Sequence, residues 1–152
     1  MKKVVSFILF LSLLFDCFVI FSSAKNTSYI DIEYFDDGSY GIVTFEPSLL
    51  LATKGTVTKT KKYSYYDSSN NLCWYVTLSG TFTYNGTSAN CSNASIAYHI
   101  YKNSRSLTSA NSSRSGATAT GNFTFKNYVL GVPIQTVNKT LTLTCDKNGN
   151  IT

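Results

Sequence analysis

The sequence is poor in the side chains that most enzymes use for catalysis. Its 152 residues include one His, two Arg and eight acidic groups, with two Pro, one Met and one Trp. General acid-base and nucleophilic catalysis need a His or a carboxylate beside an oriented partner. These counts exclude most catalytic constellations, so we expect a protein that is not an enzyme. We also expect no cofactor, no metal site and no binding to nucleic acid.

Apolar and aromatic side chains are plentiful, at 43% and 14% of the chain. A chain of about 100–200 residues is usually one domain. The apolar content gives such a domain enough surface to bury, which excludes a disordered chain. We therefore expect one folded domain.

The first 24 residues have the pattern of a secretory signal peptide. Two lysines precede an apolar run from Val4 to Phe21, and small residues lead up to Ala24. We expect cleavage after Ala24, a secreted or extracellular product and no stable membrane span afterwards. The alternative is an uncleaved anchor, because the run approaches the roughly 20 residues that cross a bilayer. Asp16 within the run favours cleavage.

Acidic residues are concentrated near the start of the expected mature chain. Five of the seven acids after Ala24 lie between residues 31 and 46, whereas residues 47–152 carry ten Lys or Arg and two acids. We expect an acidic N-terminal hairpin over residues 25–47 that is solvated or docks on the basic remainder. The basic surface is suited to an anionic extracellular polymer.

Alternation with a period of two dominates the chain, and no segment shows a helical period. Strands are expected at residues 29–35, 40–46, 56–66, 72–84, 95–101, 117–128 and 132–145. A connector covers residues 48–55, and residues 102–116 are expected to be the most polar and mobile loop. A phase slip near Gln135 indicates a β-bulge. We predict an all-β fold, an antiparallel two-sheet sandwich that is immunoglobulin-like or related, with about seven strands over residues 56–152 and the hairpin.

Three cysteines remain after the expected cleavage: Cys73, Cys91 and Cys145. In a hairpin of residues 72–84 and 95–101, Cys73 and Cys91 lie at opposite ends. At about 3.4 Å per residue they are more than about 30 Å apart, beyond the ~7 Å limit for a disulfide. Cys145 shares an inward face with Leu141 and Leu143, whereas Cys73 faces outward beside Trp74. We therefore predict a Cys91–Cys145 disulfide and a Cys73 that is free or pairs between chains.

Tyrosine is the best functional signal. Five tyrosines lie on or near faces that alternation does not bury: Tyr63, Tyr65, Tyr66, Tyr75 and Tyr101. Exposed planar rings suit stacking on sugar rings, with Asn and Thr as hydrogen-bonding neighbours. The alternative is that a second sheet covers these positions, since Tyr favours strands in general.

Three segments carry a resemblance to known proteins: Leu72–Thr87 (LCWYVTLSGTFTYNGT), Ser113–Gly121 (SRSGATATG) and Phe125–Cys145 (FKNYVLGVPIQTVNKTLTLTC). Over residues 56–149 the chain resembles small secreted Thr/Ser-rich β proteins of Gram-positive, Firmicutes-type bacteria. That group has a signal peptide, a Trp strand and a Thr-rich Cys strand, and no assigned activity. The resemblance implies a secreted β fold and no catalytic residue. Cys73 departs from its pattern, in agreement with an unpaired thiol.

We expect a secreted, non-enzymatic β-sandwich that acts as an extracellular or cell-envelope binding module. Its partner would be a cell-wall or host glycan, or an anionic surface polymer. One alternative is a membrane-active or toxin-like protein, because long Thr/Ser-alternating hairpins can assemble in lipid. A second alternative is a small secreted hydrolase that uses the outward-facing His99, alone or with Cys73.

Overall fold

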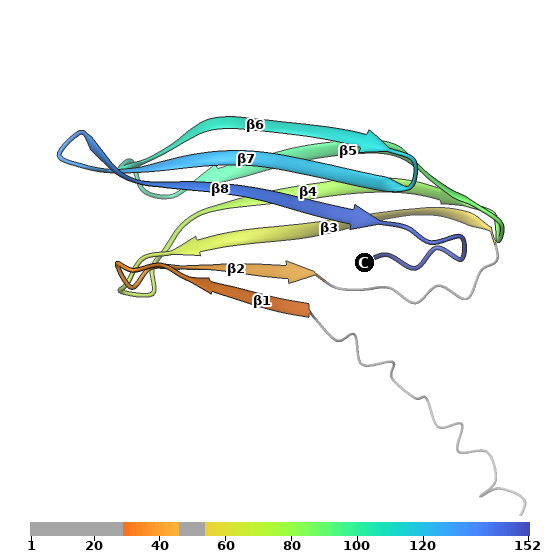
Figure 1. Cartoon of the computed structure of the whole chain (residues 1–152), viewed down its shortest axis with the longest axis horizontal. Helices are drawn as coiled ribbons and strands as arrows, with labels where there is room; N and C mark the ends of the chain where they lie inside the picture. The colour runs from red at the N-terminus through yellow and green to blue at the C-terminus, as the bar shows by residue number, and fades with distance from the viewer. Residues whose placement is uncertain (1–28, 46–53) are drawn as a thin grey trace, which may run out of the picture.

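The computed structural model describes residues 29–45 and 54–152, which form eight β-strands in two antiparallel sheets. The strands are β1 (Tyr29–Tyr34), β2 (Tyr40–Phe45), β3 (Gly55–Tyr66), β4 (Leu72–Tyr84), β5 (Ala89–Ile100), β6 (Arg105–Ser115), β7 (Thr118–Val129) and β8 (Val132–Thr144). Figure 1 shows the sheets as two layers whose strands run along the long axis of the molecule. The expected signal peptide, its cleavage site and most of the connector lie outside the described residues.

Each sheet is a meander in which every strand pairs with its neighbour in sequence, in the orders β1-β2-β3-β4-β5 and β6-β7-β8. Immunoglobulin-like sandwiches instead have Greek-key connections that place non-consecutive strands side by side. The described strands contain no such pairing. The prediction of an all-β fold with two antiparallel sheets is confirmed, and the strand order is a meander that differs from the immunoglobulin order.

The eighth strand is β6, which lies where the sequence analysis expected a loop. It pairs with β7 from Arg105 opposite Asn127 to Ser115 opposite Thr118. The loop prediction for residues 102–116 was wrong because most β6 side chains are polar and exposed, so the strand has no apolar alternation. As an edge strand, β6 is held by backbone hydrogen bonds on one side more than by side-chain burial.

Register shifts interrupt four of the strand pairings, and two of them explain changes of side-chain phase along the sequence. The β7–β8 pairing passes from Asn127 opposite Gln135 to Tyr128 opposite Pro133, which leaves Ile134 as the extra residue. This confirms the bulge predicted near Gln135. The β4–β5 pairing skips Ser92. The regular apolar alternation starts only after this bulge, at residue 95, whereas β5 itself begins six residues earlier, at Ala89.

The core lies between the two sheets and is centred on Trp74. The Trp74 ring stacks on Phe125 of the smaller sheet at 3.9 Å between centroids, with an interplanar angle of 3°. Alternate residues of β4 are buried from Trp74 to Tyr84, as the sequence predicted. Both sheets contribute further buried side chains: Val76, Leu78, Phe82, Phe123, Val137, Leu141 and Leu143.

The β1–β2 hairpin continues the larger sheet, because β2 pairs with β3 along its whole length. One of its acidic side chains also reaches the smaller sheet: Lys139 Nζ of β8 donates a hydrogen bond to Glu33 Oε1 at 2.6 Å. This ion pair links β1 to β8 along the open side of the sandwich.

Candidate functional site

Two of the five tyrosines expected at the surface, Tyr63 and Tyr65, are buried in the core. Their rings stack with Trp74 at 5.5 and 5.1 Å between centroids. The surface assignment was wrong because Lys59 and Lys61 occupy the same face of β3 and hide its apolar alternation. The burial of Tyr63 and Tyr65 removes both rings from any ligand-binding surface.

The Tyr65 hydroxyl is part of a buried polar network. It lies 2.7 Å from Ser39 Oγ, donates to Gln135 Oε1 at 2.6 Å and accepts a hydrogen bond from Asn127 Nδ2 at 2.9 Å. Burial raises the pKa of Tyr65 above its ordinary value. The network ties β3 to the β1–β2 turn and to the smaller sheet, which is a structural role.

Tyr63 lies at the base of a hollow of about 300 Å³ between the β1–β2 hairpin and β8. Its hydroxyl donates to Glu33 Oε2 at 3.4 Å, and Glu33 also pairs with Lys139. Burial, and then the Glu33 charge, raise the pKa of Tyr63 far above its ordinary value. The Tyr63 hydroxyl therefore stays protonated, and the Glu33 charge is already balanced by Lys139.

Five exposed or partly exposed tyrosines gather on the face of the five-stranded sheet that is turned away from the smaller sheet. Tyr34 is opposite Tyr40 in the register of β1 and β2, and Tyr40 is opposite Tyr66 of β3. The Tyr40 and Tyr66 rings stack with centroids 5.0 Å apart and an angle of 9°, and Tyr34 lies 5.9 Å from Tyr40. The three rings form a row across three strands.

A second aromatic group lies on β4 and at the end of β5. Tyr75 is opposite His99 in register, and their rings stack at 5.9 Å. The His99 ring meets Tyr101 edge to face at 4.4 Å, and the Lys62 ammonium lies 4.1 Å from the centre of the Tyr75 ring. The outer tyrosine face comprises the side chains of both groups: Tyr34, Tyr40, Tyr66, Tyr75, His99 and Tyr101.

The two groups are joined across β3. Ser64 lies between Ile42 and Tyr75 in register, on the outer face, yet it is only 5% exposed. Its neighbours on the same face therefore cover it. Ile32, opposite Ile42, extends the apolar strip to β1 and is partly exposed. One end of the sheet thus carries aromatic and apolar side chains across all five strands.

The sequence pattern indicates some residues of this face and not others. Tyr66, Tyr75 and Tyr101 lie on it as expected, and so does the outward-facing His99. Tyr34 and Tyr40 were missed as site residues. The turn residues after Tyr34 were the available signal, since a hairpin closed at residues 36–39 places Tyr34 opposite Tyr40.

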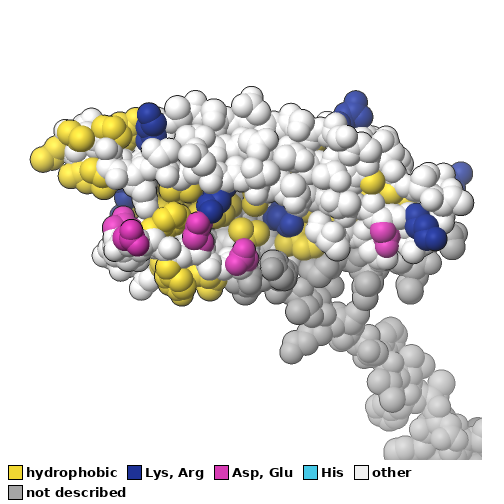
Figure 2. All heavy atoms as spheres, in the orientation of Figure 1, with side chains coloured by type: hydrophobic (Ala, Val, Ile, Leu, Met, Phe, Trp, Pro, Cys, Tyr) yellow, Lys and Arg dark blue, Asp and Glu magenta, His cyan; other side chains and the backbone are white. Residues whose placement is uncertain are grey.

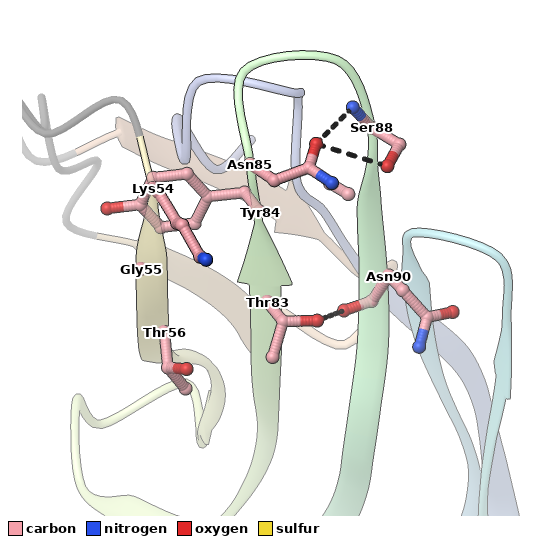
Figure 3. A pocket seen from close by; sticks show the side chains of 9 residues that line it. Lys54, Gly55, Thr56, Thr83, Tyr84, Asn85, Ser88 and Asn90 are labelled. Atoms are coloured by element: carbon pink, nitrogen blue, oxygen red, sulfur yellow. Dashed lines mark hydrogen bonds between the residues drawn. The ribbon is translucent and has the colours of Figure 1, made fainter.

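A second hollow, of about 370 Å³, lies at the other end of the five-stranded sheet (Figure 3). Asn85 Oδ1 accepts hydrogen bonds from Ser88 N at 2.8 Å and from Thr87 N at 3.0 Å, which closes the β4–β5 turn. The Tyr84 ring is wedged against Gly149, where an added Cβ would lie 2.6 Å from it. Because these groups already serve the fold, the hollow is a weaker ligand site than the outer tyrosine face.

Cys91 and Cys145 are brought to the same end of the molecule. The Cys91 N–H donates to Gly116 O at 2.8 Å, and the Cys145 N–H donates to Ala117 O at 3.0 Å. Both thiols are buried, and burial raises the pKa of each. The nearby Asp146 and then Cys91 raise the pKa of Cys145 further. The described cysteines are free thiols in the structure, and the Cys91–Cys145 bridge stays a prediction.

Cys73 is fully buried and not exposed to solvent on the outward face of β4, where the alternation had placed it. The β3–β4 register shifts between Tyr65 and Tyr66, which makes Cys73 the extra residue of a bulge. Its Sγ lies 3.5 Å from the Asn71 carbonyl oxygen, to which the thiol donates. A thiol without solvent access does not reach a substrate, so the Cys73–His99 hydrolase arrangement gains no support.

Within residues 29–45 and 54–152, no group of three or more His, Cys, Asp or Glu side chains is placed to hold a metal ion. In the same residues we find no helix that is long and apolar enough to cross a membrane.

The fold and the outer tyrosine face together define an all-β, two-sheet protein with an aromatic sheet surface. Among solved structures, it is similar to the hypothetical protein lmo2686 from Listeria monocytogenes EGD-e, with 18% sequence identity and a TM-score of 0.43. The likeness covers 82% of this chain and 96% of that chain. No family model matches the sequence, and no curated protein matches it.

Proposed function

We propose that this chain is an exported, non-enzymatic binding protein that holds a glycan of the cell envelope or of a host surface on its outer tyrosine face. The observation that supports this most strongly is the gathering of five tyrosine rings and His99 on one side of one sheet. Partly exposed planar rings on a flat sheet suit stacking against the apolar faces of sugar rings.

The rings are held in place before any ligand arrives. Tyr40 and Tyr66 stack on each other, and Tyr75 is fixed between His99 and the Lys62 ammonium. A surface whose side chains are already ordered loses little conformational entropy on binding. This favours recognition of a ligand by several weak stacking contacts along the face.

Polar groups border the rings and can orient a bound sugar by hydrogen bonds. The Lys62 ammonium and the His99 ring can donate hydrogen bonds to sugar hydroxyls, and the hydroxyl of Thr77 lies on the same face. A cation at this position favours glycans that carry carboxylate or phosphate groups. The proposal therefore predicts a preference for anionic over neutral sugars of the same ring type.

A glycan array that includes cell-wall polymers tests the proposal. We expect retention of a defined set of glycans that weakens in high salt, because the Lys62 charge is screened, but persists, because stacking on tyrosine does not depend on charge. Retention that is lost entirely in salt would point to a general anionic surface. The absence of retention on every glycan and on cell-wall fragments would contradict the proposal.

We also propose that the protein is exported and that its signal peptide is cleaved after Ala24. The chain would then belong with the small secreted Thr/Ser-rich β proteins of Firmicutes-type bacteria. In an oxidising compartment, we propose that the Cys91 and Cys145 thiols form one disulfide. The two thiols lose their hydrogens and two electrons to a disulfide-donating oxidant, which is reduced to thiols. The bridge would connect β5 of the larger sheet to the segment that follows β8.

A further inference from the structure

The tip of the β7–β8 hairpin exposes a cluster of apolar side chains. Val129, Val132 and Ile134 are each more than half exposed, and Leu130 is 100% exposed. Figure 2 shows this cluster at one extremity of the molecule, and Figure 1 shows the hairpin projecting beyond the turns of the larger sheet. Single exposed apolar residues are common, but a contiguous group at a projecting tip marks an interaction site.

The backbone at the tip has a conformation that is unfavourable for Leu130. Leu130 has φ 49° and Gly131 has φ 80°, so both central residues of the turn have positive φ. Turns with this geometry favour Asn or Asp followed by Gly, and a Leu at positive φ carries a steric cost. Because the Leu130 side chain is fully exposed, it makes no packing contacts that would offset this steric cost. Strain of this kind clusters at functional sites.

The tip is uncharged, and the sheet behind it is basic. No charged residue lies between Asn127 and Asn138, and residues 105–144 contain four Lys or Arg and no acid. Lys126 and Arg105 are the cations of β7 and β6 nearest to the tip in register. Figure 2 shows Lys or Arg side chains directly behind the apolar cluster. The exposed acids Asp36 and Asp37 belong to the turn of the other sheet.

We propose that the hairpin tip, residues 129–134, inserts into the interface of an anionic lipid bilayer. The apolar side chains would enter the boundary between headgroups and acyl chains, while Lys126 and Arg105 contact the anionic headgroups. Tyr128, next to the tip, is suited to the headgroup level. The tip lies on the three-stranded sheet, so this inference does not depend on glycan binding by the outer tyrosine face.

The small size of the cluster favours a membrane over a protein partner. A stable protein interface buries about 800 Å² on each partner, more than four side chains at a hairpin tip supply. A bilayer accepts a projecting tip without a complementary shape, and a few apolar side chains backed by cations are enough for reversible binding. The basic sheet also attracts anionic headgroups, whereas its charges would add nothing to binding in a neutral protein groove.

The test uses the protein as export releases it, recovered from the medium, with vesicles of phosphatidylcholine alone or mixed equally with phosphatidylglycerol. The informative variant is Leu130→Asn, because Asn suits positive φ and leaves the thermal stability unchanged or higher. We expect co-sedimentation with the anionic vesicles, weakened roughly tenfold by Leu130→Asn and weakened by salt. The matched control is Thr142→Asn, an exposed position of β8 away from the tip, and it should bind like the parent chain.

A second variant reports insertion directly. Trp74 is fully buried, so its emission should not respond to vesicles. In Leu130→Trp, we expect the emission to shift to shorter wavelength when anionic vesicles are added. Binding that is absent, equally strong for Leu130→Asn, or equally strong on neutral vesicles would overturn the proposal. A dimer in solution that Leu130→Asn dissociates would also overturn it, because the tip would then be a contact between copies.

Discussion

Gly41 leaves the space that the buried Tyr63 ring occupies. A Cβ at residue 41 would lie 1.9 Å from the Tyr63 hydroxyl oxygen and 2.3 Å from Cζ. The ring cannot retreat, because it packs against Trp74 and Phe123. Overpacking of this kind costs about 1–3 kcal/mol. We expect Gly41→Ala to lower the free energy of unfolding by that amount, measured by urea denaturation.

The control for this prediction is a double-mutant cycle with Tyr63→Leu. Removing the ring lowers stability by itself, but it also removes the atoms that the new Cβ meets. In that background, Gly41→Ala should cost much less than in the parent chain. An equal cost in both backgrounds would show that the ring does not set the requirement for glycine.

Asp67 is a source of acid sensitivity. Its carboxylate accepts hydrogen bonds from Lys102 Nζ at 2.8 Å and from Asn71 N at 2.9 Å. The Lys102 contact first, and the Asn71 contact next, lower the pKa of Asp67 well below its usual range. A lowered native pKa gives stability that is complete above the unfolded value of about 3.9 and is lost as the pH falls toward the native value.

We therefore expect the thermal unfolding temperature to fall as the pH drops below about 4. In Asp67→Asn this part of the decline should be smaller, and Lys102→Met should reduce it in the same way, because it removes the main cause of the shift. Calorimetry across this pH range gives the measurement. Parallel curves for the parent chain and both variants would contradict the assignment.

At the residue scale, sequence patterns assigned a side chain to the core only where apolar residues repeated without interruption. Trp74 and its alternate neighbours on β4 were placed correctly, because that strand repeats its apolar face over its length. Tyr63 and Tyr65 were misplaced because Lys61 shares their face. The Lys61 ammonium lies 5.2 Å from the Phe45 ring, and burial lowers its pKa. A lysine of this kind hides the core face from a sequence pattern.

At the element scale, β6 was not predictable from its own residues. Its sequence is rich in Ser, which is typical of loops, and only its pairing with β7 makes it a strand. By contrast, the β7–β8 hairpin was predictable, because Gly131 supplies a turn residue between two apolar runs. The bulge at Ile134 was equally visible as a break in the alternation.

Hydrogen exchange tests the assignment of β6. As an edge strand bonded on one side, it should protect about half of its backbone amides, in an alternating pattern. The matched comparison is β7, which is bonded on both sides and should protect nearly all of its amides. Unprotected exchange along the whole of residues 105–115 would restore the loop interpretation.

At the scale of the whole molecule, the predicted disulfide would join the two sheets. It closes a loop from Cys91 to Cys145, for which chain entropy gives about 4 kcal/mol of stability. We expect peptide mapping of the exported protein to find these two cysteines linked and Cys73 reduced. Denaturation under reducing conditions should then lower stability by a similar amount, and Cys73→Ser should not reproduce that loss.

The overall architecture was predictable in class but not in topology. Strand alternation indicated two antiparallel sheets, because each strand has one apolar face to bury. The order of the strands depends on pairing partners, which alternation does not encode. The outer tyrosine face was not predictable for the same reason. Tyr34, Tyr66 and Tyr75 come together only because β1 to β4 are consecutive neighbours in one sheet.

Glycan binding by the outer tyrosine face is tested most directly by a matched pair of substitutions. Tyr101 belongs to this face and is 54% exposed, whereas Tyr98 is 51% exposed and contacts Phe125 of the other sheet. Calorimetric titration with the glycan best retained on the array should show binding weakened roughly tenfold by Tyr101→Ala and unchanged by Tyr98→Ala, as expected for the loss of about 1.4 kcal/mol of stacking. Equal affinity for both variants and the parent chain would contradict the account.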